Sequence, residues 1–155
     1  MKNETEIEIA DVYIHYKVLK KIFKHFVRTL PKEAIGFLLG DRYVYKGKDW
    51  VEVIDYLPLK ADASETFVVP LEGSLGEISG ILEKRKLLVV GWAHSHPGYG
   101  CFLSSVDLET HRRCFSQSYH VALVMDPLTG EYDIFTIRGN SYERVHFKEV
   151  IKRGR

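Results

Sequence analysis

The chain has 155 residues, 45% of them hydrophobic and 28% charged, which suits one compact globular domain with a core of its own. Its 22 basic and 21 acidic side chains leave a formal net charge of +1, so charge gives no reason to expect a nucleic-acid partner. No apolar run approaches the roughly 20 residues that cross a bilayer, no signal-peptide pattern opens the chain, and two cysteines are too few for a disulfide framework, which together predict a cytoplasmic protein with no membrane partner.

The first periodic pattern lies between Tyr16 and Leu30. Apolar residues recur there at intervals of three and four, which predicts one amphipathic helix: Leu19, Ile22, Phe23, Phe26, Val27 and Leu30. The opposite side is basic, with Lys17, Lys20, Lys21, Lys24 and Arg28. A basic face can bind a membrane or an acidic partner, but we expect the solvated side of a packed helix. Pro31 ends the helix.

The pattern then predicts strands and one further helix before residue 86. Ala34–Leu39 is a short apolar run that predicts a buried strand, closed by Gly40 and Asp41. The next segments in chain order are an alternating strand, a polar loop and a strand-like stretch: Trp50–Leu57, Leu59–Glu65 and Thr66–Val69. Apolar residues from Leu71 to Leu82 are at helical spacing, although three glycines weaken this helix by roughly 1 kcal/mol each relative to alanine.

The second half of the chain predicts four strands and one helix. Leu87–His96 is an apolar run that we interpret as a central strand, broken by Pro97, and a helix is expected to start at Ser104. Three strands follow, separated by turns at Asp126-Pro127 and Gly139-Asn140: Tyr119–Met125, Glu131–Ile137 and Tyr142–Phe147.

The order of these elements predicts an α/β (α+β) fold, in which helices flank a mixed β-sheet. No repeat, linker or low-complexity stretch divides the chain, so residues 1–155 are expected to form a single domain. We expect its core to span about residues 12–147, and the basic C-terminal tail, residues 148–155, to be solvated.

The segment from Gly91 to His111 contains the residue types that bind metals. His94 and His96 are two apart at the end of the predicted central strand, and alternation along a strand puts both imidazoles on one face. Asp107 follows after a glycine-rich turn that can fold a helix start back over the strand end. Two histidines and a carboxylate match a catalytic zinc site, which uses three protein ligands and leaves one position open.

Each of these residues also has an ordinary structural interpretation. His94 and His96 could be buried strand residues that only form hydrogen bonds, because a single His-x-His is weak evidence. Ser104 and Asp107 also fit a helix-capping pair, in which the cap residue is followed three residues later by an acid. The two roles are compatible, since Ser104 can cap the helix while its hydroxyl points at a metal.

The order His94, one residue, His96, seven residues, Ser104, two residues, Asp107 resembles the complete signature of the JAMM (MPN-plus) zinc metalloproteases. The surrounding segment is similar to the deubiquitinating members of that family in the proteasome lid and in prokaryotes. The resemblance runs from about Glu33 to Ile137, with the block from Gly91 to Asp107 the specific part. It implies a cytidine-deaminase-like sandwich and one Zn²⁺ per chain, held by His94, His96 and Asp107.

The resemblance also implies catalytic roles for Glu33 and Ser104. Members of the family use a glutamate on an earlier strand as general base, and Glu33 matches its position. Sequence spacing alone does not choose Glu33 over Glu52 or Glu65. The hydroxyl of Ser104 is expected to stabilise the oxyanion together with the metal.

Cys101 lies close to the expected site but lacks a dedicated base, so we expect a small packing residue rather than a nucleophile. Cys114 is expected to fill the core. His111 falls one helical turn after Asp107 and could support the metal site, but an exposed helix residue is the favoured interpretation.

The resemblance implies a substrate, namely the bond that follows the C-terminal glycine of ubiquitin or a ubiquitin-like protein. A loop at Ala61–Val69 falls where relatives pair with the extended ubiquitin tail, and we expect a strand edge near Ser64–Val69 to do so. A second insertion of relatives is replaced by the short turn Asp126–Gly130. Two alternatives stay open: a peptidase that trims a ubiquitin-like or sulfur-carrier precursor, and a non-catalytic MPN scaffold. Intact candidate residues argue against the scaffold.

Overall fold

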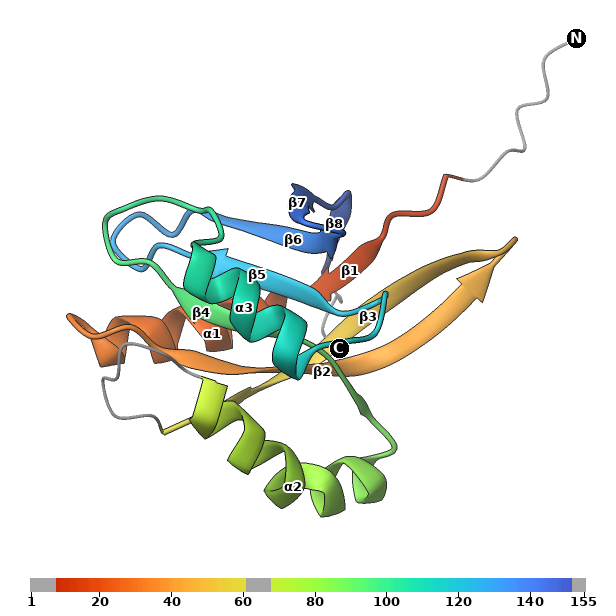
Figure 1. Ribbon diagram of the computed structural model, residues 1–155, viewed down its shortest axis with the longest axis horizontal. Helices are drawn as coiled ribbons and strands as arrows, with labels where there is room; N and C mark the ends of the chain where they lie inside the picture. Colours follow the sequence, from red (N-terminus) through yellow and green to blue (C-terminus); the bar gives the residue numbers. More distant parts are fainter. Residues whose placement is uncertain (1–7, 61–67, 152–155) are drawn as a thin grey trace, which may run out of the picture.

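The computed structural model describes residues 8–60 and 68–151. In these ranges eight strands and three helices follow one another in the chain (Figure 1). Their order is β1 (Val12–His15), α1 (Tyr16–Thr29), β2 (Ile35–Tyr45), β3 (Lys48–Pro58), α2 (Val68–Arg85), β4 (Leu88–Ser95), α3 (Ser105–Cys114), β5 (Val121–Met125), β6 (Tyr132–Arg138), β7 (Ser141–Arg144) and β8 (Phe147–Val150). In the described ranges no helix has the length and apolar character that a membrane crossing requires.

The strands form one mixed, curled sheet in the order β7-β6-β5-β4-β2-β3-β1-β8. β4 and β5 run parallel, as β1 does with β3 and with β8, and the other neighbours are antiparallel. Side chains of α1 pack in one apolar cluster with one face of the sheet, while α2 and α3 contribute to a second cluster on the other face. Helices therefore cover both faces (Figure 1), and the predicted α/β class is confirmed.

Helix α1 follows the predicted amphipathic pattern. Its buried residues are Val18, Leu19, Ile22 and Phe26, and its lysines lie on the exposed side. Two residues of the predicted apolar stripe depart from it, because Phe23 and Val27 are each 40% exposed.

The prediction that the first strand closes at Gly40 and Asp41 is wrong. β2 continues to Tyr45 and returns as β3 through a tight turn at Lys46 and Gly47, both at positive φ. The register between β2 and β3 shifts between Leu39 and Gly40, and a Cβ on Gly40 would lie 1.8 Å from the Glu52 carbonyl oxygen. Gly40 therefore marks a bulge with close backbone contact, not the end of a strand.

The strand-like interpretation of Thr66–Val69 also needs correction. Thr66 lies outside the described residues, whereas Val68 and Val69 form the first positions of α2. Pro70 follows in the first turn, where proline is tolerated because its missing amide would have no helical partner. The tail-binding edge expected at Ser64–Val69 is therefore not a strand in its described part, while the predicted helix from Leu71 to Leu82 is confirmed within α2.

The segment Tyr142–Phe147, which was predicted as one strand, contributes to two short strands, β7 and β8. These two strands form the opposite edges of the sheet. Val145 donates its amide to the Ile134 carbonyl of β6, and the next carbonyl, that of His146, accepts from Asp11 just before β1. β8 then pairs in parallel with β1, a four-residue strand that the sequence pattern did not reveal. The curl of the sheet makes this switch between its two ends possible. The expected tail over residues 148–155 is therefore wrong in its first part, because the chain is a paired strand as far as Val150.

Candidate metal centre

Strand β4 places both histidines at its carboxyl end, on the face covered by α2 and α3. Its neighbours are β2, through Ile35 opposite His94, and β5, through Val124 opposite His94. The alternate residue Ser95 points to the other face, where its hydroxyl accepts the Ala34 amide at 2.7 Å. His94 is 0% and His96 2% exposed, so the prediction that they share one face and lie close together is confirmed.

Helix α3 brings Asp107 to the same place through its N-terminal cap. The Ser104 hydroxyl oxygen accepts the Asp107 amide at 3.1 Å, and Asp107 Oδ2 accepts the Ser104 amide at 2.8 Å. This is a reciprocal capping box, which fixes the first turn of the helix against the glycine-rich loop before it. The sequence left open whether Ser104 and Asp107 form a helix cap or belong to a metal site. The cap places the Asp107 carboxylate beside the two histidines, so both interpretations apply to the same residues.

Three possible ligand atoms converge in this corner. His94 Nε2 lies 3.1 Å from His96 Nε2 and 3.1 Å from Asp107 Oδ2, and His96 Nε2 lies 3.3 Å from Asp107 Oδ2. Donors in a tetrahedral zinc shell with bond lengths of 2.0–2.1 Å are about 3.3–3.4 Å apart. The buried group of His94, His96 and Asp107 could therefore hold a metal ion with little rearrangement.

The protonation pattern of the cluster also fits a cation. His96 Nδ1 lies 3.1 Å from the Gly100 carbonyl oxygen, which only accepts, so Nδ1 carries the proton and Nε2 presents a lone pair in the neutral ring. Burial alone would raise the pKa of Asp107, but the hydrogen bond from His94 and the Ser104 amide that donates to its Oδ2 hold that pKa well below its usual range, so the carboxylate is charged. An anionic oxygen and an imidazole lone pair aimed at one point are what a metal ligand set requires.

His111 is buried, so the favoured interpretation as an exposed helix residue is wrong. It is 3% exposed, and its Nδ1 accepts a hydrogen bond from Trp92 Nε1 at 3.0 Å. Burial, followed by the charges of His120 and Arg112, lowers the pKa of His111 to about 4, so the ring is neutral at pH 7 and can accept. The i, i+4 spacing from Asp107 was the signal that places both side chains on the inner face of α3.

Glu33 is linked to the cluster through Tyr99. The Ala34 carbonyl accepts the Ser95 amide at 3.0 Å, so the antiparallel pairing continues past Ile35 and brings Glu33 next to His96. The hydroxyl of Tyr99 donates to Glu33 Oε2 at 2.5 Å, and the ring of Tyr99 stacks on that of His96 with centroids 4.9 Å apart. Sequence reasoning did not identify Tyr99, an aromatic residue between two glycines at positive φ, Gly98 and Gly100.

Glu52, the rival candidate for the base that the structure describes, differs from Glu33 in position. Glu52 lies on β3 and bonds to His15 at 2.6 Å, away from the cluster, and Glu65 lies outside the described residues. An open pocket of about 550 Å³ extends from Glu33 along α1 and the end of β3; its walls include His25, Thr29 and Leu59. Glu33 therefore borders both the histidine cluster and a space that a substrate can enter.

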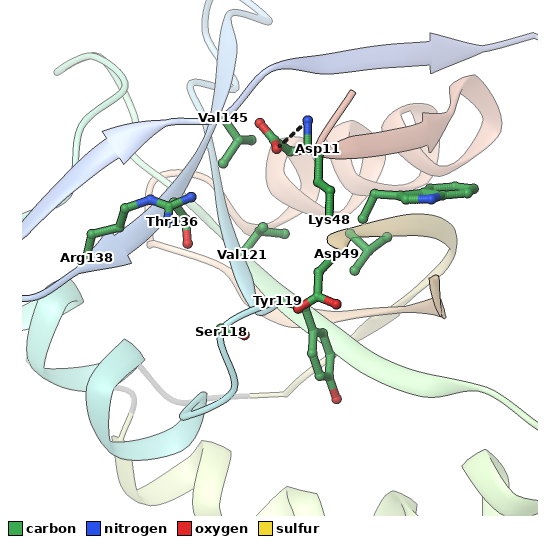
Figure 2. A pocket seen from close by; sticks show the side chains of 11 residues that line it. Asp11, Lys48, Asp49, Ser118, Tyr119, Val121, Thr136, Arg138 and Val145 are labelled. Carbon is green, nitrogen blue, oxygen red and sulfur yellow. Dashed lines mark ion pairs between the residues drawn. The ribbon is translucent and has the colours of Figure 1, made fainter. Parts of the chain in front are cut away.

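A second pocket, of about 240 Å³, lies at the opposite end of the strands, around the start of β5 (Figure 2). Its charged side chains already have partners: Lys48 pairs with Asp11 at 3.3 Å and Asp49 with Arg42 at 2.9 Å. Arg138, the remaining cation of the lining, pairs with Glu143. These pairs neutralise the pocket, which gives no comparable chemical site.

The remaining predicted features near the site fit ordinary packing roles. The Cys101 thiol donates to the Glu131 carbonyl oxygen at 3.4 Å, and burial raises its pKa, which makes it a poor nucleophile at neutral pH.

The short turn at Asp126–Gly130 is confirmed, with the Gly130 amide bonded to the Asp126 carbonyl at 2.7 Å. The buried Asp126 carboxylate also accepts the amides of Gly98 and Leu128 and so joins this turn to the loop after His96.

Comparison with known proteins agrees with this geometry. Residues 8–118 match the family model described as "JAB1/Mov34/MPN/PAD-1 ubiquitin protease". The chain is 36% identical over 133 residues to the 26S proteasome regulatory subunit RPN11 of Eremothecium gossypii, covering 80% of this chain and 42% of that protein. It is 35% identical over 122 residues to the ubiquitin carboxyl-terminal hydrolase RPN11 of Saccharomyces cerevisiae, covering 76% and 39%. The chain thus spans about two fifths of the length of these relatives.

A solved structure shares the fold. The solution structure of protein DSY2949 from Desulfitobacterium hafniense aligns with a TM-score of 0.71, 20% identity and coverage of 91% of this chain and 94% of the other. That similarity concerns the fold alone, whereas the family match extends over strands β1 to β4 and helix α3 with all three clustered residues. On this evidence the chain belongs to the JAB1/Mov34/MPN/PAD-1 family, the JAMM/MPN proteins.

Proposed function

We propose that this protein is a zinc-dependent isopeptidase that cleaves the bond after the C-terminal glycine of ubiquitin or a ubiquitin-like protein. In this proposal His94, His96 and Asp107 hold one zinc ion, and Glu33 and Ser104 are the catalytic residues. The observation that carries it is the convergence of three buried ligand atoms at 3.1–3.3 Å, next to a carboxylate that borders an open pocket.

The donor set favours zinc over the other common divalent ions. Two imidazole nitrogens and one carboxylate oxygen are typical zinc ligands, whereas magnesium and calcium prefer oxygen ligands alone. Three protein ligands leave one tetrahedral position open, as catalytic zinc sites do. When bound, zinc supplies Lewis acidity and lowers the pKa of a coordinated water toward about 7.

Glu33 is proposed as the general base and acid. Its carboxylate is half-buried beside His96, and the hydroxyl of Tyr99 holds one of its oxygens. The second oxygen is available to take a proton from the attacking water and to deliver it to the leaving amine. Tyr99 in this arrangement restricts the position of the carboxylate.

Ser104 is proposed as the donor to the oxyanion. Its oxygen accepts the Asp107 amide, and a hydroxyl group retains one proton that it can donate elsewhere. The first turn of α3 is fixed by the capping box, so the hydroxyl is held in place before substrate binds. Such preorganised donors stabilise the negative charge that develops on the carbonyl oxygen in the transition state.

The substrate class is taken from the family and from relatives that are named ubiquitin hydrolase and proteasome subunit. The same chemistry serves a peptidase that trims a ubiquitin-like or sulfur-carrier precursor after its glycine, so the two activities differ only in the leaving group. We propose a cytoplasmic location on the sequence alone, because two cysteines are too few for the disulfide framework of a secreted domain.

The proposal is tested by incubating zinc-loaded protein with two substrate types: ubiquitin-like proteins joined to lysine through an isopeptide bond, and linear precursors extended beyond the glycine. Cleavage after the glycine, abolished by a chelator and restored by zinc, is the expected result. Preference for the isopeptide substrates supports the isopeptidase, and preference for linear precursors the processing peptidase. A zinc-loaded protein that cleaves neither would instead support a non-catalytic scaffold.

A further inference from the structure

The imidazole of His94 is oriented without the hydrogen bond that normally fixes a metal-binding histidine. Such histidines almost always donate their second ring N–H to a carbonyl, a carboxylate or water. His96 follows that rule, because its Nδ1 bonds to the Gly100 carbonyl oxygen at 3.1 Å. His94 Nδ1 is buried and has no hydrogen-bond partner in the described part of the chain. Within the described part of the chain, a stacked ring takes the place of that hydrogen bond.

That ring is the indole of Trp92. The two rings are stacked, with centroids 4.5 Å apart and planes 13° from parallel. Trp92 is fully buried and precedes His94 by two residues, so both side chains leave β4 on the same face. An indole fixed in this position prevents the imidazole from tilting, and so keeps Nε2 directed at His96 and Asp107.

The indole is fixed in turn by α3. Trp92 Nε1 donates to His111 Nδ1 at 3.0 Å, and the ring of Phe115 lies parallel to the indole within 3° at a centroid distance of 5.8 Å. His111 follows Asp107 by one helical turn, and both side chains are buried. One rigid helix therefore carries Asp107 to the cluster and controls the orientation of His94 at the same time.

We propose that His111 is a positioning residue for His94, acting through the Trp92 indole, and that it raises the affinity of the site for its metal. The inference rests on the proposed zinc site, and it adds His111, which is not among the residues proposed for that site. Partners that orient metal-binding histidines typically change metal affinity or activity by about 10–100-fold when they are removed. His111 orients His94 indirectly, because it holds the Trp92 indole on which the His94 imidazole stacks.

The test measures the zinc dissociation constant of the folded protein by competition with a chromogenic chelator. His111→Leu keeps a similar volume but leaves the buried indole N–H without an acceptor, and its affinity is expected to fall by about 10–100-fold. His111→Gln retains an acceptor oxygen and is expected to bind zinc within about threefold of wild type. Trp92→Phe keeps an aromatic ring without the N–H, and is expected to lose affinity as His111→Leu does.

A destabilised control separates positioning from general loosening. Ile22→Ala removes buried volume from the cluster on the opposite face of the sheet, so it lowers stability without touching the chain of contacts from α3 to His94. Its zinc affinity is expected to stay at the wild-type value, with urea midpoints recorded for every variant. If Ile22→Ala loses as much affinity as His111→Leu, the inference is overturned.

Two further outcomes would separate this inference from the proposed function. Wild-type zinc affinity in His111→Leu, or in Trp92→Phe if His111→Leu does not fold, overturns the role of His111 alone. A wild-type protein that binds no zinc overturns the metal site, and the inference with it.

Discussion

Glu33→Gln is expected to lower kcat by about 10²-fold or more while zinc content and the urea midpoint stay at wild-type values. Glutamine has nearly the same shape, and its amide oxygen can still accept the hydrogen bond from Tyr99. It cannot take a proton from water or return one to an amine, so the loss falls on turnover and not on the fold. Steady-state kinetics on a ubiquitin-like conjugate, with metal analysis of the same samples, measures this effect.

Glu52→Gln is the matched control, because Glu52 was the rival candidate on sequence alone. Glu52 bonds to His15 away from the cluster, so its replacement is expected to leave kcat nearly unchanged in protein that remains folded. Near-wild-type turnover in Glu33→Gln together with a large loss in Glu52→Gln would transfer the role of base to Glu52.

Ser104→Ala is expected to lower kcat by about 10²–10³-fold, the usual result of removing one oxyanion donor. The same change removes the helix cap, which costs about 1 kcal/mol of stability. Activity is therefore measured on zinc-saturated protein well below its unfolding temperature. The stability loss alone would leave kcat intact under those conditions, since nearly all molecules remain folded.

Ser104→Thr distinguishes the two roles of this hydroxyl. Threonine keeps both the capping oxygen and the donor proton, so kcat and the unfolding temperature are expected to return close to wild type. A Ser104→Ala enzyme that retains kcat within about fivefold would contradict the oxyanion role and leave Ser104 as a cap only.

The ligand cluster was predictable because each of its parts depends on local structure. Alternation along one strand places His94 and His96 on a single face, and a capping signal at Ser104 places Asp107 in the first turn of the next helix. The loop between them is only eight residues long, from Pro97 to Ser104, so the helix start has to lie near the strand end. No long-range pairing needed to be known for this part of the site.

The residues around the cluster depend on long-range pairing, and sequence spacing could not identify them. Glu33 reaches His96 because β2 pairs with β4 across some sixty positions of the chain, as the hydrogen bonds between Ala34 and Ser95 record. Only the family resemblance selected it. Tyr99 and His111 have their roles through contacts with Glu33 and Trp92 that periodicity does not encode.

The errors in the predicted fold have equally specific causes. Gly40 was interpreted as a strand end, but glycine also allows the close approach of two strands at a bulge. β1 and β8 have four residues each, too few for a period of two to be recognised, and their pairing depends on the curl of the whole sheet. Val68 and Val69 have high strand propensity but lie in α2, where the helical pattern of the following residues determines the structure.

Metal analysis tests the central claim most directly. Protein purified without added metal is expected to contain about one equivalent of zinc per chain, the amount that one three-ligand site with an open position binds. The double variant His94→Ala/His96→Ala, which removes two of the three ligands, is expected to contain almost none while circular dichroism still shows a folded protein. A full equivalent of zinc in that double variant, or none in the wild type after incubation with zinc, would contradict the assignment of His94, His96 and Asp107 as a zinc site.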